Sequence, residues 1–257
     1  MAVDAARAAG RLLRDELSGV RRIAYKGAPT NLVTEMDARA EAEILGRLRG
    51  AFPDDAILSE EHGAAAGSSG RRWIVDPLDG TTNYAHGLPV FGVSIALAAE
   101  RRIVLGVVYD PTRDELFVGE RGLGATLNDA AIRVSAATTL DASLLVTGFP
   151  YNIRQTHDTN LAEYAVFSVR ARAVRRLGSA VIDLAYVACG RFDAYWELRL
   201  GAWDVAAGGL LVEEAGGRLT GIDGKPMDVD APTLLASNGL VHEAMLSVLK
   251  EVRTERR

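Results

Sequence analysis

Apolar residues at helical spacing predict two helices at the start of the chain. The first is amphipathic, with its apolar face formed by Val3, Ala6, Leu13, Leu17 and Val20. The second is predicted from about Glu35 to Arg49, with Thr34 as its N-terminal cap. A turn and a short strand, Ala56–Leu58, follow, and the Gly-, Ala- and Ser-rich residues 63–70 are expected to form a mobile surface loop.

The next stretch of the chain carries a strand pattern. Strands are predicted at Trp73–Val75, Phe91–Ala98, Ile103–Tyr109, Glu115–Glu120 and Ala125–Leu127. Short Gly, Pro and charged breaks separate these runs, which favours antiparallel meander connections. We therefore predict an N-terminal α+β lobe that comprises residues 1–138.

From about residue 140 onward, strand and helix patterns alternate. Strands are predicted at Ser143–Thr147, Ala171–Arg175, Asp193–Leu198 and Thr233–Ala236, and helices at Ser179–Gly190, Trp203–Ala215 and Val241–Val252. This alternation is typical of an α/β arrangement, so we predict a C-terminal α/β lobe of residues 139–257. No Pro/Ser-rich linker separates the two lobes, which are expected to form one compact unit with a cleft between them.

Composition narrows the classes of function and the location. With 48% hydrophobic and 25% charged residues the chain is an ordinary globular sequence. Its net charge of -5 argues against a protein that mainly coats nucleic acid. A single cysteine, Cys189, excludes an intrachain disulfide framework and suits a reducing compartment. No signal-peptide pattern and no apolar run of about 20 residues are present, so we expect a cytoplasmic protein without membrane contact.

Two aspartates stand where the apolar run Trp73–Val75 ends, in Asp76-Pro77-Leu78-Asp79-Gly80-Thr81. Because Pro77 fixes its own φ and biases the preceding residue towards extended geometry, we expect the strand to stop there. Gly80 and Thr81 can open a helix whose free N–H groups attract an anion. Carboxylates for a hard cation beside such amides indicate a metal-assisted phosphatase. The alternative interpretation is a strand–turn–helix in which Asp79 or Thr81 only caps the helix.

Other acidic residues stand at the edges of predicted elements: Glu60 and Glu61 after a strand, and Asp204 and Asp37 in the first turns of helices. Each alone is compatible with capping or with a solvated surface. If several of them converge on Asp76 and Asp79, two carboxylates about 4 Å apart repel by roughly 4 kcal/mol at an effective dielectric of 20. Such a cluster needs protons or cations, and Mg²⁺ prefers these oxygen ligands. The one cysteine and four histidines show no zinc-ligand spacing.

The chain resembles the inositol monophosphatase family, within the magnesium-dependent, lithium-sensitive phosphatases. Four blocks in order, spread over essentially the whole length, carry the resemblance: Leu32-Val33-Thr34 with Asp37, Ile57-Leu58-Ser59-Glu60-Glu61, Trp73 through Pro89, and Trp203-Asp204-Val205-Ala206-Ala207-Gly208 followed by Glu213-Glu214-Ala215-Gly216-Gly217. The resemblance implies a layered αβαβα sandwich, in which two sheets have helices between and outside them. It also implies a homodimer.

The resemblance further implies roles for individual residues. The first of two to three Mg²⁺ ions would be held by Glu60, Asp76 and the Leu78 carbonyl, and the second by Asp76, Asp79 and Asp204. Glu60 would also reach a third, mostly hydrated ion. The amides of Gly80 and Thr81 would bind phosphate oxygens, the Thr81 hydroxyl would orient the attacking water, and Asp37 would bind that threonine. Glu61 is expected to lie behind Glu60. Direct attack by a metal-activated water, without a phosphoenzyme, follows.

Substrate choice is carried by fewer residues. Glu197, seven positions before Asp204, and Ala180, in Gly178-Ser179-Ala180, resemble the family's contacts to the inositol ring, and Asp79 would add a further hydroxyl contact. The expected reaction is hydrolysis of inositol 1-phosphate to inositol and phosphate. Fructose 1,6-bisphosphatase activity remains an alternative. A second alternative is a metal-stabilised regulatory or binding protein with incidental activity.

Overall fold

The computed structural model describes residues 1–19, 23–25, 32–230 and 233–255. Its helices are α1 (Ala2–Asp15), α2 (Glu35–Ala51), α3 (Thr81–Ala85), α4 (Leu161–Arg170), α5 (Ala180–Ala188), α6 (Ala202–Glu214) and α7 (His242–Glu255). Its strands are β1 (Ile23–Tyr25), β2 (Leu32–Thr34), β3 (Ala56–Ser59), β4 (Gly63–Ala65), β5 (Arg71–Asp79), β6 (Gly92–Ala99), β7 (Arg102–Asp110), β8 (Glu115–Glu120), β9 (Gly124–Leu127), β10 (Ala130–Ala131), β11 (Leu144–Thr147), β12 (Ala173–Arg175), β13 (Ala194–Glu197), β14 (Arg218–Thr220) and β15 (Leu234–Ser237).

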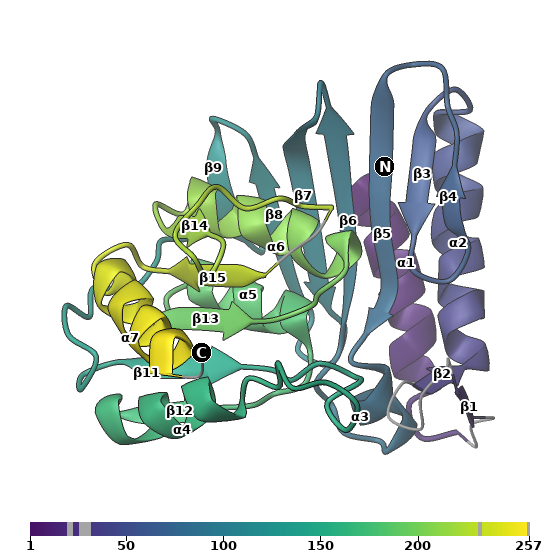
Figure 1. Cartoon of the computed structure of the whole chain (residues 1–257). Helices are drawn as coiled ribbons and strands as arrows, with labels where there is room; N and C mark the ends of the chain where they lie inside the picture. The colour runs from purple at the N-terminus through teal and green to yellow at the C-terminus, as the bar shows by residue number, and fades with distance from the viewer. Residues whose placement is uncertain (20–22, 26–31, 231–232, 256–257) are drawn as a thin grey trace.

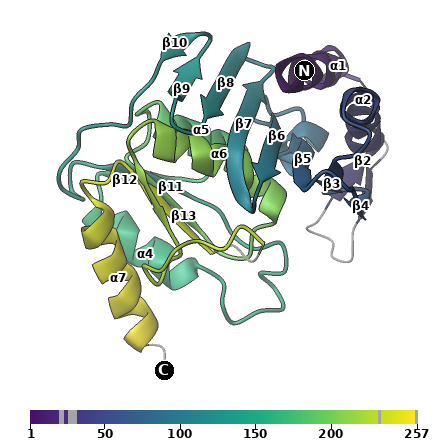
Figure 2. The ribbon, with the colours of Figure 1, turned by 90° about the horizontal axis from the view of Figure 1, so that it is seen from above.

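Within the described residues these elements stack in five layers (Figures 1 and 2). Helices α1 and α2 cover one face of an eight-stranded sheet with strand order β10-β9-β8-β7-β6-β5-β3-β4. Helices α5 and α6 lie between its other face and a five-stranded sheet of order β12-β11-β13-β15-β14, and α4 and α7 cover the outside of that second sheet. The predicted αβαβα sandwich is confirmed. The boundary predicted near residue 138 falls between β10 and β11, the last and first strands of the two sheets.

Strand β5 illustrates how the sequence builds two cores at once. Its side chains point alternately to the two faces of the sheet, so Trp73 and Val75 pack with α1 and α2 while Ile74 packs towards α5 and α6. All three are at most 3% exposed, which explains the uninterrupted apolar run in the sequence. A third core lies between the smaller sheet and α4 and α7.

The structure corrects one prediction about β5. The strand does not stop at Pro77 but continues to Asp79, although its pairing with β6 is irregular between Asp76 and Asp79. Pro77 and Leu78 fall in this irregularity, because a proline has no N–H to donate to the ladder. The carboxylates of Asp76 and Asp79 therefore project from one continuous strand, on either side of the irregularity.

Other boundaries shift for local reasons. Helix α1 ends at Asp15, so the predicted helical residue Leu17 lies beyond it, and Val20 lies outside the described residues. The antiparallel meander from β5 to β10 is confirmed, and β3 pairs with β5 in parallel. Helix α4 and strand β14 were not predicted. The loop expected at 63–70 is mostly exposed, but it begins with β4, and the amides of Ser68 and Ser69 bind the Asp54 carbonyl.

Candidate active site

Three carboxylates from two elements lie close together at the C-terminal end of β5. One oxygen from each of Asp76, Asp79 and Asp204 lies within 4.8 Å of the others, in a grouping that could hold a metal ion. Asp76 and Asp79 come from the irregular end of β5, and Asp204 from the first turn of α6. One Asp76 oxygen accepts the Leu78 amide at 3.0 Å, while its other oxygen is buried and has no hydrogen-bond partner among the residues that the structure describes. The structure thus brings together Asp76, Asp79 and Asp204, three of the acids whose convergence was considered in the sequence analysis.

Burial and mutual repulsion act together on these groups. Burial, followed by the charges of Glu60, Asp79 and Asp204, raises the pKa of Asp76 well above its usual value. Burial and the charges of Asp79 and Glu60 likewise raise the pKa of Asp204. Burial also raises the pKa of Asp79, against hydrogen bonds from Ser179 and from backbone amides. Neutral carboxyls or bound cations relieve this repulsion, since like charges in a low-dielectric site disfavour joint ionisation.

Glu60 lies at the edge of the cluster and Glu61 beside it. Glu60 is half-buried after β3, and its amide donates to the Val75 carbonyl at 3.2 Å. Its charge reaches Asp76 and Asp204, as their raised pKa values show, although it is not one of the three residues within 4.8 Å. Glu61 is half-buried too and is not one of those three either.

A buried glutamate that the sequence analysis missed supports the turn Ser59–His62, which carries Glu60. Glu41, in α2, is 0% exposed and accepts hydrogen bonds from the Ser59 hydroxyl and the His62 amide, the latter at 3.1 Å. It also contacts the His62 ring. Both ends of the Ser59–His62 segment are therefore tied to one carboxylate, which fixes the backbone that carries Glu60. Only the position of Glu41 on the inner face of a predicted helix could have drawn attention to it.

Thr81 and Asp37 form a second part of the site. Asp37 is fully buried, and one of its oxygens accepts the Thr34 amide at 2.8 Å and the Thr34 hydroxyl at 2.7 Å, within the capping box of α2. Its other oxygen lies 3.0 Å from the Thr81 hydroxyl, which is also 3.0 Å from the Leu78 carbonyl. The pair predicted between Thr81 and Asp37 is thus present. Gly80 precedes Thr81 with φ of 92°, a conformation that favours glycine.

A small cavity of about 60 Å³ opens beside the cluster. Asp79 closes one side, where it accepts the Ser179 hydroxyl at 2.6 Å and the Val181 amide at 2.8 Å. Ala180, the first residue of α5, and Glu197, the last of β13, line it as well. Burial raises the pKa of Glu197 to about 7, although the Tyr195 hydroxyl donates to this carboxylate at 2.5 Å.

The same cavity contains groups that the sequence did not single out. Asp183, in α5, lines it with 1% exposure, and one of its oxygens is buried without a hydrogen-bond partner in the described part of the chain. Burial and then the charges of Glu197 and Asp79 raise its pKa well above the usual value. Gly148 leaves room for the Glu197 side chain, since a Cβ at position 148 would lie 2.0 Å from a Glu197 oxygen. Buried polar atoms without partners are the positions at which a ligand hydroxyl is most effective.

Comparison with known proteins agrees with this geometry. The model of the inositol monophosphatase family matches residues 1–254. An inositol-1-monophosphatase of Synechocystis sp. is 45% identical over 97% of this chain and 87% of its own length, and a protein named Nus factor SuhB from Pseudomonas aeruginosa is 41% identical over 97% and 94%. The solved inositol monophosphatase of Anabaena (Nostoc) sp. has a TM-score of 0.89 and 45% identity, with 97% of this chain and 94% of that one covered. The chain belongs to the inositol monophosphatase family.

Proposed function

We propose that the protein is a Mg²⁺-dependent phosphomonoesterase whose preferred substrate is inositol 1-phosphate. The observation that carries the proposal is the group formed by Asp76, Asp79 and Asp204, with an unpartnered Asp76 oxygen inside it. A phosphatase that uses direct, metal-assisted attack by water needs such a group of carboxylates and a side chain that can position the water, and Thr81 offers a hydroxyl for this role.

The donor set fits a hard divalent cation. All of its side-chain donors are carboxylates, and their raised pKa values mark a site that lacks positive charge. Glu60, Asp76 and the Leu78 carbonyl would hold one ion, and Asp76, Asp79 and Asp204 a second, with Glu60 also close to a third. When bound, the ions supply the positive charge that a phosphate ester needs in order to enter an acidic cavity and to be polarised there.

Thr81 and Asp37 would then position the nucleophilic water. The hydroxyl has one proton and faces two acceptors at 3.0 Å, the Asp37 carboxylate and the Leu78 carbonyl. Because its proton is directed towards these acceptors, its lone pairs are left to accept a hydrogen bond from water. A water bound in this way has its own lone pair free for in-line attack on phosphorus. The amides of Gly80 and Thr81 would bind the phosphate oxygens.

The cavity beside the cluster suits a polyol. Glu197, Asp183 and Asp79 present carboxylate oxygens to a space lined by the start of α5, including Ala180. A hydroxyl-rich ring would donate to these acceptors, whereas an analogue without the hydroxyls would leave them buried and unpaired. The same chemistry would admit fructose 1,6-bisphosphate, which remains the alternative substrate. The proposal includes a homodimer, which the family resemblance implies.

A second candidate function is that of a metal-stabilised binding protein. Relatives at 41% identity are named Nus factor SuhB, so a protein or nucleic-acid partner is a candidate for this chain as well. Among the described residues no helix is both long enough and apolar enough to cross a membrane.

Phosphate release separates these functions. Purified protein is assayed with inositol 1-phosphate, fructose 1,6-bisphosphate and glycerol 2-phosphate, each with Mg²⁺ and with EDTA. We expect Mg²⁺-dependent release that is fastest with inositol 1-phosphate and is lost in Asp79→Asn. The control Asp141→Asn changes an exposed aspartate by the same charge and should behave as the parent. No Mg²⁺-dependent release from any ester would refute the proposal and favour the binding protein.

A further inference from the structure

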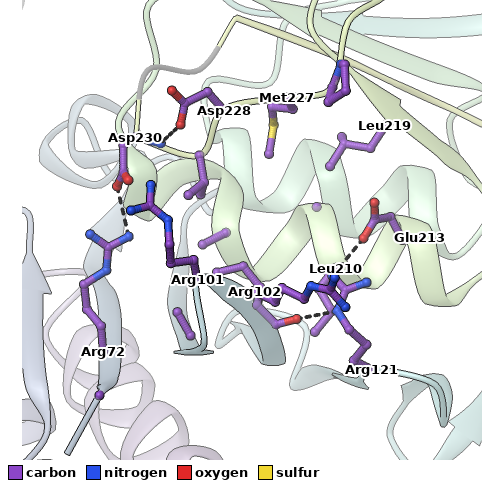
Figure 3. A pocket seen from close by; sticks show the side chains of 17 residues that line it. Arg72, Arg101, Arg102, Arg121, Leu210, Glu213, Leu219, Met227, Asp228 and Asp230 are labelled. Atoms are coloured by element: carbon purple, nitrogen blue, oxygen red, sulfur yellow. Dashed lines mark hydrogen bonds and ion pairs between the residues drawn. The ribbon is translucent and has the colours of Figure 1, made fainter.

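A larger cavity of about 660 Å³ lies away from the acidic cluster. It is bounded by the start of β5, the hairpin between β6 and β7, the part of α6 from Ala206 to Glu213 and the segment 226–230 (Figure 3). The carboxylates of the candidate active site stand at the other ends of the same elements, Asp76 and Asp79 late in β5 and Asp204 early in α6. Asp204 and Glu213 are separated by about 13 Å at the rise of an α-helix, so the two sites are distinct.

Four arginines line this cavity, and two of them are already neutralised. Arg72 pairs with Asp230 at 2.9 Å, and Arg121 pairs with Glu213 at 3.0 Å. For the exposed side chains of Arg101 and Arg102, by contrast, no ion pair or hydrogen bond occurs with any other described residue. Figure 3 shows Arg101 beside the first ion pair and Arg102 beside the second.

The backbone is strained in the turn that carries Arg101. Glu100 and Arg101 form the two-residue turn of the β6–β7 hairpin, and both have positive φ, 50° and 62°. Hairpin turns of this kind favour Asn and Gly, because other side chains are strained in the left-handed region. Strain of this kind is concentrated at functional sites. The turn therefore places two adjacent guanidinium groups at the cavity rim against its local preference.

Part of the remaining wall of the cavity is apolar, and this part determines the kind of anion that fits. Leu210 from α6, Leu219 from β14 and Met227 line it, as Figure 3 shows. Guanidinium groups bind phosphate bidentately and stack on flat rings, while an apolar wall accepts the body of a ligand. A volume of this size matches pockets for small molecules.

The charge balance of the cavity argues against a long polyanion. Asp230 and Glu213 are already paired with Arg72 and Arg121, and a third acid, Asp228, also lines the cavity. Arg101 and Arg102 alone are too few to neutralise successive phosphates of a nucleic-acid backbone, but they suffice for a single phosphate. We propose that this cavity binds a nucleoside monophosphate, with its phosphate on Arg101 and Arg102 and its base against the apolar wall.

Calorimetric titration of the whole protein in EDTA tests the proposal, because without Mg²⁺ the acidic cluster repels phosphate esters. The probes are adenosine 5′-monophosphate, adenosine and inorganic phosphate. We expect saturable binding of the nucleotide and at least tenfold weaker binding of either part alone. In the double variant Arg101→Asn/Arg102→Gln the nucleotide should bind at least about tenfold more weakly, the equivalent of one charge-assisted contact. Asn suits the positive φ, and both side chains are exposed, so this variant should fold.

The matched control is Arg11→Gln/Arg172→Gln, which removes the same charge from exposed positions outside the cavity. It should bind the nucleotide as the parent does. Absence of nucleotide binding at millimolar concentration would overturn the proposal. So would equal binding by the parent and the Arg101/Arg102 variant, an equal loss in the control, or equally tight binding of adenosine or phosphate alone. Calorimetric titration in EDTA does not measure phosphatase activity, so its result tests nucleotide binding independently of the function proposed above.

Discussion

Replacement of Asp76 by Asn should stabilise the metal-free protein and weaken its response to Mg²⁺. In the parent, an oxygen of the Asp76 carboxylate lies within 4.8 Å of oxygens of both Asp79 and Asp204, and one Asp76 oxygen has no hydrogen-bond partner among the described residues. Asn keeps the oxygen that accepts the Leu78 amide and can place an N–H group where the orphaned oxygen stands. Repulsion between charges is thereby exchanged for attraction between an amide dipole and the neighbouring carboxylates.

The size of the effect follows from the spacing. Two unit charges 4.8 Å apart repel by about 3.5 kcal/mol at an effective dielectric of 20. Part of this repulsion is already relieved in the parent by proton uptake, because the pKa values of the cluster are raised. Each unit of such a shift corresponds to about 1.4 kcal/mol. We therefore expect a gain of about 1–3 kcal/mol in the free energy of unfolding near neutral pH, or several degrees in Tm.

The pH dependence has a definite sign. Carboxyls with raised pKa values bind protons more tightly in the folded state than in the unfolded state, so stability is greatest at low pH and falls as pH rises through the folded-state values. In EDTA the parent should lose stability as pH rises from the ordinary aspartate pKa of about 3.9 through the raised folded-state pKa values of the cluster, and Asp76→Asn should lose less.

Denaturant unfolding of the parent, Asp76→Asn and the exposed control Asp141→Asn, each in EDTA and in Mg²⁺, measures both effects. Mg²⁺ should stabilise the parent and the control strongly but Asp76→Asn only weakly, since ligand binding to the folded state adds to stability. A variant that is less stable than the parent in EDTA, or that gains as much from Mg²⁺, would refute the argument that these carboxylates repel one another in the folded state.

Three further predictions concern the groups around the cluster. Thr81→Ala should lower kcat by about 10²-fold or more with little change in KM, and Thr81→Ser should recover most of it, because the hydroxyl is proposed to position water; equal loss in both variants would contradict this role. Gly148→Ala should raise KM for inositol 1-phosphate more than for glycerol 2-phosphate, because its Cβ displaces Glu197; unchanged selectivity in steady-state assays would argue against Glu197 as a substrate contact. Glu41→Gln should weaken Mg²⁺ activation by loosening the turn that carries Glu60, and an unchanged Mg²⁺ titration would show that this anchor is dispensable.

The fold was largely predictable because the central strands of the larger sheet, β5 to β8, are long and the two sheets differ in pattern. The predicted strand Glu115–Glu120 matches β8 to the residue, and the helix from Glu35 begins where its capping box places it. Pro77 misled the prediction, because a local rule about proline assumed a regular ladder at that point. In the structure the irregularity in β5 absorbs the proline and the strand continues.

The site was predictable only as far as its motif extends. Asp76, Asp79 and Thr81 share one short segment, and Asp204 and Asp37 stand at helix starts, where an acid is noticeable in the sequence.

Asp183 and Glu41 carry no such mark. Each lies on a predicted helix among apolar neighbours, and its importance comes from being buried near groups distant in the sequence. A local sequence pattern does not show which distant residues will lie beside an acid in the folded chain, so it cannot mark such an acid as part of the site.

The placement of α6 explains how such an unfavourable cluster is maintained. A Cβ on Gly106 of β7 would lie 2.7 Å from the Ala207 carbonyl, so this helix packs with its backbone directly against the sheet. At its start, the Asp204 carboxylate accepts the Gly201 amide at 2.6 Å, which fixes the side chain as well. Strand β5 and helix α6 cannot move apart to relieve the repulsion between the carboxylates without opening the central core. The fold therefore holds the carboxylates close at a cost in stability, and cation binding offsets that cost.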